Sequence, residues 1–283
     1  METNQISRVI MDKARYISGI LMALLVTGLI LFIPDLSLWL VFNIIISLCC
    51  LEFVRLRFSN LAACISSIAL FSLAYLLKDI LFFNILFITL SFSLWIILIP
   101  LILAFPHNKT FLQSPQTWIL FGFISFLGFS GGINLILFNQ LTLDSEFSTR
   151  GMLLFIICIA AFTDIFAYFI GKSLGKRKFL QNVSPKKTLE GFIGGVILSS
   201  LFLSISFFIF KEVSLIYLFL LILITSIFSI IGDASASLFK RVSGSKDSSN
   251  LIPGHGGIFD RIDSHLAALP VFLFFNFYVF NIF

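Results

Sequence analysis

Residues 80–104 read ILFFNILFITLSFSLWIILIPLILA, a stretch without a single formally charged side chain. The hydrocarbon layer of a membrane, about 30 Å thick, is crossed by a helix of about 20 apolar residues. Closed barrels are built from short alternating segments, so a continuous apolar run can satisfy its backbone hydrogen bonds in a membrane only as a helix. The stretch therefore predicts a membrane-spanning helix and sets the class of the chain.

Further apolar runs of similar length predict the same structure along the rest of the sequence. They cover residues 16–33, 36–54, 60–77, 117–138, 151–170, 191–210, 214–231 and 266–282. The composition agrees, because 59% of the 283 residues are hydrophobic and 12% are charged, with a mean hydropathy of +1.07. We therefore predict an all-α integral membrane protein, a polytopic bundle of about nine transmembrane helices.

The lysines and arginines predict how this bundle is oriented. With the N-terminus in the cytoplasm, 16 of the 19 cations fall in cytoplasmic segments, and only Lys78, Arg150 and Lys211 fall outside. Short cytoplasmic loops of membrane proteins carry such an excess of Lys and Arg. We expect a multi-pass protein of the inner (plasma) membrane whose first helix is uncleaved.

Two other features of the composition limit the possible partners. All cysteines lie inside apolar runs without metal-binding spacing, so we interpret them as buried apolar side chains. The pI of about 9.1 comes from basic loops beside the membrane. These loops favour anionic lipid head groups as partners and argue against nucleic acid, which needs a soluble basic face.

The two halves of the chain differ in their polar residues. Residues 1–140, with about five spans, are chemically quiet. Their few charges lie at span ends, and Glu52 stands three residues before Arg55, which predicts a local ion pair. Residues 141–283 place charges where the bilayer normally rejects them. We therefore predict a C-terminal catalytic region with a polar cavity that faces the cytoplasm.

The first charged segment of the C-terminal half surrounds Asp164. Asp164, Tyr168 and Lys172 are spaced four residues apart, so they share one face of a helix. An internal ion pair is the structural alternative. An ionised Asp within a span costs about 2.5–3.5 kcal/mol on insertion scales, so a functional role is the better interpretation.

The second segment is SPKKTLEGFIGG, residues 184–195. Ser184 followed by Pro185 predicts a helix N-cap with proline at the first helical position. The free backbone N–H groups of that first turn would lie beside Lys186 and Lys187. A helix N-terminus with two ammonium groups predicts a polyphosphate site, although a basic anchor at the membrane surface is the simpler alternative.

The third segment leads out of the eighth apolar run. Asp233 and Ser237 are four residues apart, and Lys240 and Arg241 follow at the next turn, so these side chains also share a helical face. In the fourth segment, His255 is surrounded by glycines that include Gly256 and Gly257. Such a loop lets the backbone come close to a ligand.

Carboxylates in these segments suit a magnesium ion. Asp260 and Asp263 lie three residues apart, with Arg261 between them, on a helix expected after the glycine loop. Mg²⁺ is usually held by one or two carboxylates together with substrate phosphates and water. Asp233 and Asp260 come from different helices, and we predict that they hold a divalent cation over a phosphate.

The run SLFKRVSGSKDSSNLIPGHGGIFDRID, residues 237–263, resembles the C-terminal signature of phosphatidate cytidylyltransferases, membrane enzymes that make CDP-diacylglycerol. The segments around Asp164 and at 184–191 resemble other recurring segments of the same family, in the same order. Phe166 stands where a small residue is expected, which affects local packing only. A signature with so many fixed polar positions is far more specific than a glycine-rich loop alone.

The resemblance implies that an oxygen of phosphatidate attacks the α-phosphorus of CTP and that pyrophosphate leaves. It implies Mg²⁺ at Asp233 and Asp260, leaves open a second, monovalent or divalent, cation, and implies a homodimer. The implied catalytic residues are Asp233, Lys240, Asp260, Arg261 and Asp263. The implied substrate-binding residues are Asp164, Tyr168, Lys172, Ser184, Lys186, Lys187, Thr188, Glu190, Ser237, Arg241, Lys246, Asp247, His255, Gly256 and Gly257.

Two other functions remain open at this point. The chain could be a CTP-dependent enzyme that acts on another lipid, such as an ether-lipid phosphate or a polyprenol. It could also be a transporter whose broken helices bind an anionic solute. Transport fits less well, because the charged cluster lies at one membrane face and the sequence has no inverted repeat.

Overall fold

The computed structural model describes residues 19, 21, 23–138, 149–208, 214–251 and 256–280. Eight helices within these residues are long and apolar enough to cross a membrane. They are α2 (Asp35–Arg55), α3 (Asn60–Leu77), α4 (Leu81–Leu103), α6 (Pro115–Leu137), α7 (Thr149–Leu174), α8 (Leu189–Phe208), α9 (Leu215–Val242) and α10 (Phe259–Phe275), which η1 (Asn276–Phe280) continues. The remaining elements are the short helix α5 (Lys109–Leu112) and the strands β1 (Lys178–Leu180) and β2 (Ser184–Thr188).

The prediction of an all-α polytopic membrane protein is confirmed. Each of these long helices coincides with one predicted apolar run. The remaining predicted run, 16–33, lies partly outside the described residues, and its described part contains the apolar helix Ala23–Phe32. The ninth span and the cytoplasmic N-terminus stay predictions.

Two helices extend beyond the apolar runs that predicted them. Helix α9 continues to Val242, past the predicted end at residue 231, and α10 begins at Phe259, before the predicted start at residue 266. Both extensions carry the charged residues of the third and fourth segments. A hydropathy pattern ends where the charges begin, whereas the backbone hydrogen bonds of a helix continue through them.

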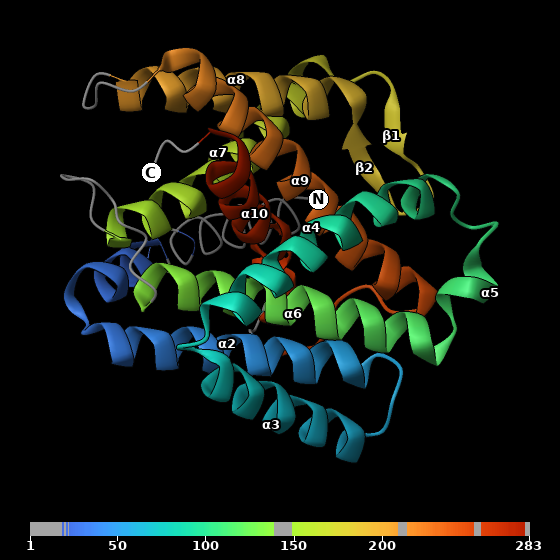
Figure 1. The fold of residues 1–283 in the computed structure, drawn as a ribbon. Coiled ribbons are helices and arrows are strands. Elements are labelled where there is room, and N and C mark those ends of the chain that lie inside the picture. Colours follow the sequence, from blue (N-terminus) through green and yellow to red (C-terminus); the bar gives the residue numbers. More distant parts are fainter. Residues whose placement is uncertain are drawn as a thin grey trace, which may run out of the picture.

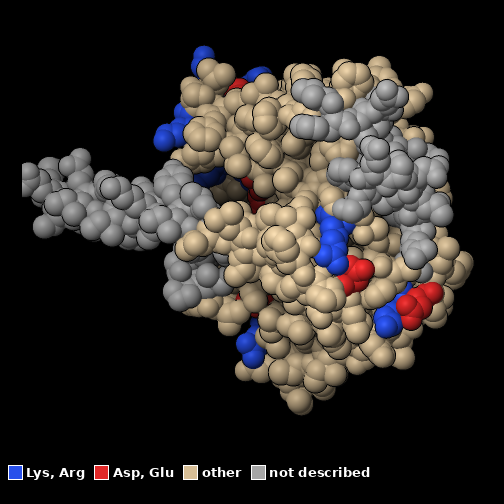
Figure 2. Space-filling view, turned by 90° about the vertical axis from the view of Figure 1, so that its left-hand side faces the viewer, with Lys and Arg blue, Asp and Glu red and all other residues tan. Residues whose placement is uncertain are grey.

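The loops rich in lysine and arginine gather at one end of the bundle, where the β1–β2 hairpin and α5 lie at the right of Figure 1. Asn182 Nδ2 donates to the Phe105 carbonyl at 3.1 Å, which ties the hairpin to the end of α4. At the opposite end, Arg150 Nη2 lies 2.8 Å from Asp35 Oδ1 and joins α7 to α2. Figure 2 shows this opposite end, where few charged side chains lie among uncharged ones.

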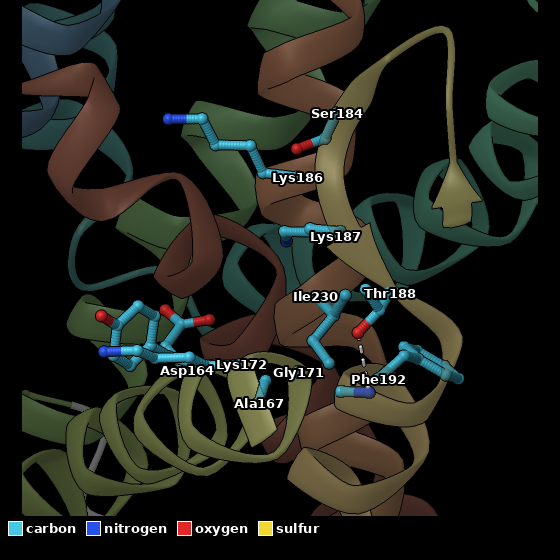
Figure 3. Close-up of a pocket in the computed structure, with 12 residues that line it drawn as sticks. Asp164, Ala167, Gly171, Lys172, Ser184, Lys186, Lys187, Thr188, Phe192 and Ile230 are labelled. Atoms are coloured by element: carbon cyan, nitrogen blue, oxygen red, sulfur yellow. Dashed lines mark hydrogen bonds between the residues drawn. The ribbon is translucent and has the colours of Figure 1, made fainter. Parts of the chain in front are cut away.

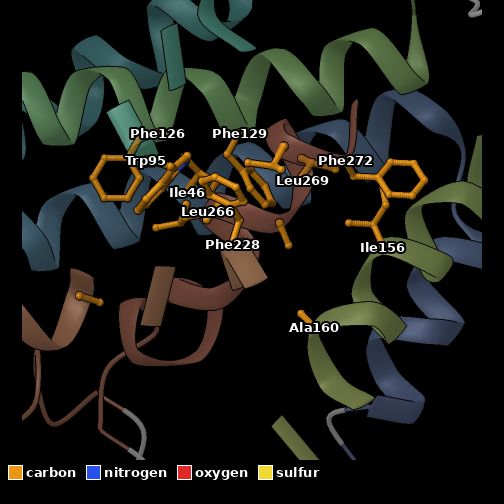
Figure 4. Close-up of a cluster of buried hydrophobic side chains, with 14 of the residues drawn as sticks. Ile46, Trp95, Phe126, Phe129, Ile156, Ala160, Phe228, Leu266, Leu269 and Phe272 are labelled. Atoms are coloured by element: carbon orange, nitrogen blue, oxygen red, sulfur yellow. The ribbon is translucent and has the colours of Figure 1, made fainter. Parts of the chain in front are cut away.

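Helix α10 lies in the middle of the bundle and packs against α4, α6, α7 and α9. Figure 4 shows the buried cluster around it, which includes Trp95, Phe126, Phe228 and Phe272. Gly132 on α6 allows the close contact with α10, because a Cβ there would lie 2.9 Å from Leu269 Cδ2. This packing fixes the helix that carries Asp260 and Asp263.

Helices α7 and α8 approach each other along a seam of small residues. A Cβ on Gly191 would lie 2.8 Å from the Ala167 carbonyl oxygen, and one on Gly195 would lie 2.7 Å from Ala167 Cβ. Gly171 lies opposite Gly191, where its Cβ would be 3.6 Å from the Gly191 Cα. Larger side chains would force the helices apart, so the seam sets the spacing between the residues of α7 and those at the start of α8.

Candidate active site

A cavity of about 410 Å³ lies between α7, β2, the start of α8 and α9 (Figure 3). It brings together polar residues from the first two charged segments of the sequence. Those that line it are Asp164, Tyr168, Lys172, Ser184, Lys186, Lys187 and Thr188. The helical face predicted for α7 is confirmed by this cavity, because its members line one wall and Lys172 Nζ lies 5.7 Å from the centre of the Tyr168 ring.

The predicted helix N-cap at Ser184 is wrong. Residues Ser184–Thr188 form β2, which pairs with β1 in antiparallel register, Lys178 opposite Thr188. Helix α8 starts at Leu189, and the Thr188 Oγ1 accepts a hydrogen bond from the Gly191 N–H at 3.2 Å. Threonine therefore caps the helix after the lysines, so Lys186 and Lys187 reach the cavity from a strand and not from a helix N-terminus.

Lys187 forms an ion pair with Asp233, which joins β2 to α9. Asp164 on α7 also interacts electrostatically with both side chains. Burial disfavours the charged form of Lys187, but the carboxylates of Asp233 and Asp164 outweigh this effect and raise the pKa of Lys187 above its ordinary value. Lys187 is therefore protonated and places a positive charge on the wall of the cavity.

Asp263 lies beside Asp233, because α9 and α10 are in close contact here. A Cβ on Gly232 would lie 2.6 Å from the Asp263 carbonyl oxygen. The Asp263 side chain is buried, and its Oδ1 accepts a hydrogen bond from the Ser264 N–H at 2.8 Å. Its carboxylate interacts electrostatically with those of Asp233 and Asp164, so α7, α9 and α10 each direct one acidic side chain to the same region.

Asp260 is held by a second lysine and by the loop before α10. Its Oδ1 lies 2.6 Å from Lys240 Nζ. Its Oδ2 accepts hydrogen bonds from the Ser248 N–H at 2.9 Å, the Ser248 hydroxyl at 3.0 Å and the Gly257 N–H at 3.0 Å. Each of the two predicted metal ligands, Asp233 and Asp260, thus has a lysine of its own as partner.

Four acidic side chains and two lysines meet where β2, α7, α9 and α10 come together: Asp164, Asp233, Asp260 and Asp263 with Lys187 and Lys240. Lys172 and Lys186 also line the cavity. Among the described residues, no three His, Cys, Asp or Glu side chains are close enough together to hold a metal ion. One or two carboxylates together with phosphate and water can hold Mg²⁺ without such a group.

The other predicted catalytic and substrate-binding residues lie around the C-terminal end of α9. Arg241 Nε donates to the Val183 carbonyl at 3.4 Å, which brings it beside the hairpin. Lys246 and Asp247 are exposed on the following loop, and Arg261 is exposed on the first turn of α10. Ser237 is half-buried on α9.

Four further predicted residues remain, and Glu190 is one that lies away from the cavity. Glu190 accepts hydrogen bonds from the Lys176 and Arg177 N–H groups at 3.0 and 3.1 Å and pairs with the Arg177 side chain, so it holds the chain before β1 and does not line the cavity. Gly256 has φ +79°, and Gly257 lies against Ser248. His255 falls outside the described residues.

Glu52 is the residue that the sequence interpretation undervalued. It is 3% exposed, and its carboxylate accepts hydrogen bonds from the loop before α10. The predicted local pair with Arg55 is not among the ion pairs of the described residues. The position of Glu52 inside the apolar run LCCLEFV could have indicated its role. A buried carboxylate needs hydrogen-bond donors, and an apolar run supplies none from its side chains.

Comparisons with known proteins agree on one family. Residues 13–279 match the model of the cytidylyltransferase family. A phosphatidate cytidylyltransferase of Haemophilus influenzae is 38% identical over 194 residues, which cover 66% of this chain and 67% of that protein.

Proteins of the same name from two other bacteria match over shorter stretches. The one from Bacillus subtilis is 45% identical over 124 residues, 43% of this chain and 46% of that protein. The one from Pseudomonas aeruginosa is 42% identical over 125 residues, 44% of this chain and 46% of that protein. The matched stretches therefore span less than half the length of these two relatives.

Proposed function

The chain belongs to the cytidylyltransferase family, and we propose that it transfers the cytidylyl group of CTP to phosphatidate, giving CDP-diacylglycerol and pyrophosphate. The family resemblance inferred from the motifs is confirmed by the match over residues 13–279. The observation that carries the proposed activity is a cavity lined by three lysines and Asp164 directly beside an apolar one, in a multi-pass membrane protein.

The polar cavity suits a triphosphate. Lys172, Lys186 and Lys187 supply ammonium groups from two walls, α7 and β2. The phosphatidate oxygen forms a bond to the α-phosphorus as the bond from that phosphorus to the bridging oxygen of pyrophosphate breaks. Positioning and charge stabilisation meet most of the demands of such a transfer, and fixed ammonium groups provide both.

The neighbouring cavity suits the lipid. It has a volume of about 220 Å³, lies between α4, the hairpin, α8 and α9, and is lined entirely by apolar side chains. Phe192 and Ile230 line both cavities. An acyl chain in the apolar cavity would place its phosphate at the polar one. Arg241, beside the hairpin, would bind that phosphate through hydrogen bonds from its planar guanidinium group.

We further propose that Asp233 and Asp260 hold Mg²⁺. They lie on the neighbouring helices α9 and α10 and each pairs with one lysine, and Mg²⁺ is usually held by one or two carboxylates with substrate phosphates and water. When bound, Mg²⁺ would offset the charge that develops on the leaving pyrophosphate. The residues of the chain orient the two phosphates, and Lys187 stays protonated throughout.

The location and assembly of the enzyme belong to the same proposal. The lysine-rich hairpin, whose strand β2 lines the polar cavity, lies at one end of the bundle (Figure 1). We assign this end to the cytoplasmic face of the inner membrane, where CTP is found. We propose that the protein is a homodimer, as the family resemblance implies. Crosslinking in intact membranes tests the homodimer. Cysteine labelling of residues at either end of the bundle tests which end faces the cytoplasm.

The decisive experiment measures pyrophosphate release by the purified protein in detergent with CTP, Mg²⁺ and phosphatidate. Release that requires all three supports the proposal. A panel of other lipid phosphates and a polyprenol separates phosphatidate from other acceptors. Counterflow of a labelled anion in proteoliposomes, without pyrophosphate release, would replace the enzyme with a transporter.

A further inference from the structure

We propose that Glu52 on α2 is a positioning residue for the reaction, because its buried carboxylate holds both the loop that binds Asp260 and the first turn of α10. The inference rests on the proposed function. It gives a catalytic purpose to the N-terminal half of the chain, which sequence patterns describe as chemically quiet.

Both oxygens of Glu52 are fully used. Oε1 accepts hydrogen bonds from the Ser249 hydroxyl at 2.7 Å and the Ile258 N–H at 3.1 Å. Oε2 accepts from the Ser248 hydroxyl at 2.9 Å and the Phe259 N–H at 2.9 Å. The ionised form of a carboxyl group has acceptors only, which suits this set of donors. Hydrogen bonds to such a charged group are among the strongest in proteins.

Two of these donors belong to the N-terminus of α10. The first N–H groups of a helix have no partner inside the helix, and they favour a negative charge. Helix α10 starts at Phe259 and has no side-chain cap of its own at Ile258. Glu52 therefore caps α10 from another helix, and it fixes where this helix begins relative to α2.

Ser248 links Glu52 to Asp260. Its hydroxyl group lies 2.9 Å from Glu52 Oε2 and 3.0 Å from Asp260 Oδ2, and its single hydrogen can serve only one carboxylate at a time. Asp260 also binds the backbone of the same loop at Ser248 and Gly257. A Cβ on Gly257 would overlap both the Ser248 hydroxyl and the Glu52 carboxylate. The two acids and the loop are therefore one packed unit.

Glu52 acts through this unit and not on the substrates. Its side chain is buried and does not line the polar cavity. Loss of its charge would free the loop and the first turn of α10, so that Asp260 and Lys240 lose their fixed geometry. We therefore expect turnover to fall while CTP binding, which uses lysines of α7 and β2, stays nearly the same.

The test is Glu52→Gln, which keeps the size of the side chain but turns an NH₂ donor toward groups that are themselves donors. We expect kcat to fall roughly tenfold or more while the KM for CTP changes little. Hydrogen exchange of the amides at Ser248, Gly257 and Phe259 should accelerate, with α7 and α8 unchanged. Asp35→Asn is the matched control at the other end of α2, where the carboxylate is 50% exposed, and both readouts should stay at wild-type values.

Either of the two readouts, kcat or hydrogen exchange, can overturn the inference. Wild-type kcat or unchanged exchange at these amides in Glu52→Gln overturns the inference. If this variant fails to fold, Ser249→Ala removes one donor to Oε1, and a wild-type kcat together with wild-type exchange in that variant likewise overturns it. The exchange measurement needs no substrate. A wild-type protein without activity on CTP and phosphatidate would therefore defeat the proposed function while leaving the role of Glu52 in holding the loop to be decided by exchange.

Discussion

The ammonium group of Lys187 on β2 pairs with the carboxylate of Asp233 on α9, across the boundary between the hairpin and the helical bundle. Lys187 lines the cavity in which we place the triphosphate. A phosphate group that binds Lys187 competes with Asp233 for the same cation. Nucleotide binding at this position would therefore free the Asp233 carboxylate, which would link the triphosphate site to the proposed magnesium site.

Lys187→Met removes the ammonium group and retains an apolar chain of similar length. We expect the KM for CTP to rise at least about tenfold, because a charged hydrogen bond to phosphate is lost. Steady-state kinetics at saturating phosphatidate measure this KM. Lys176→Met is the control, since Lys176 is exposed and does not line the cavity. Equal KM values for the two variants would contradict the assignment.

The ion pair of Lys187 also predicts a dependence of stability on pH. The pKa of Lys187 is raised by Asp233 and Asp164, so the folded protein holds this proton more tightly than the unfolded chain does. The contribution is fully present below the ordinary lysine value and is lost as the pH rises through the pKa of the folded state. Thermal unfolding from pH 8 to 12 should show a loss of Tm at the alkaline end that is smaller in Lys187→Met than in Lys176→Met.

Asp260→Asn should abolish turnover and leave a folded protein. The amide retains one acceptor for the loop but loses the charge that Lys240 and the proposed Mg²⁺ require. Pyrophosphate release measures activity, and gel filtration with a thermal shift measures folding. Arg57→Ala should be nearly neutral, because Arg57 is an exposed cation away from both cavities. Wild-type activity in Asp260→Asn would remove Asp260 from the catalytic group.

Gly257→Ala should destabilise the protein by about 1–3 kcal/mol, the usual cost of overpacking. The new methyl group would overlap the Ser248 hydroxyl and the Glu52 carboxylate. The Tm of thermal unfolding and kcat should both fall. Gly28→Ala is the matched control, because nothing lies within 4 Å of a Cβ at Gly28. A Tm equal to that of the control would contradict the close packing of the loop around Gly257.

Removal of divalent cations should stop the reaction. EDTA is expected to abolish pyrophosphate release and added Mg²⁺ to restore it, because we assign Mg²⁺ to Asp233 and Asp260 as the ion that offsets the charge on the leaving pyrophosphate. Mg²⁺ should also raise the Tm of the wild-type protein by linkage, and do so less in Asp233→Asn. Full activity in EDTA would exclude the proposed role of the metal.

The helices were the most predictable part of the fold, because hydrocarbon thickness dictates the length of an apolar run. The ends of α9 and α10 were not predictable in this way, since hydropathy cannot follow a helix into a charged cluster. The cap of α8 was misplaced because Ser184-Pro185 suits a strand as well as a helix start, and only pairing with β1 decides between them.

The same reasoning explains what was found and missed at the site. Asp164, Tyr168 and Lys172 were predictable because helical spacing is a local property. The role of Glu52 depends on Phe259, which is far away in the sequence, and no local pattern reports such a contact. The ion pair between Lys187 and Asp233 likewise joins elements that only the packing of the bundle brings together.

The seam of small residues between α7 and α8 has a consequence for substrate exchange. Ala167 fits against Gly191 and Gly195, so the α7–α8 wall of the polar cavity is closely packed. On the other side, Lys187 of β2 pairs with Asp233 of α9, and Arg241 of α9 donates to the Val183 carbonyl. A polyanion that binds Lys187 would compete with Asp233 for its charge, so we expect any widening of the cavity to occur between β2 and α9.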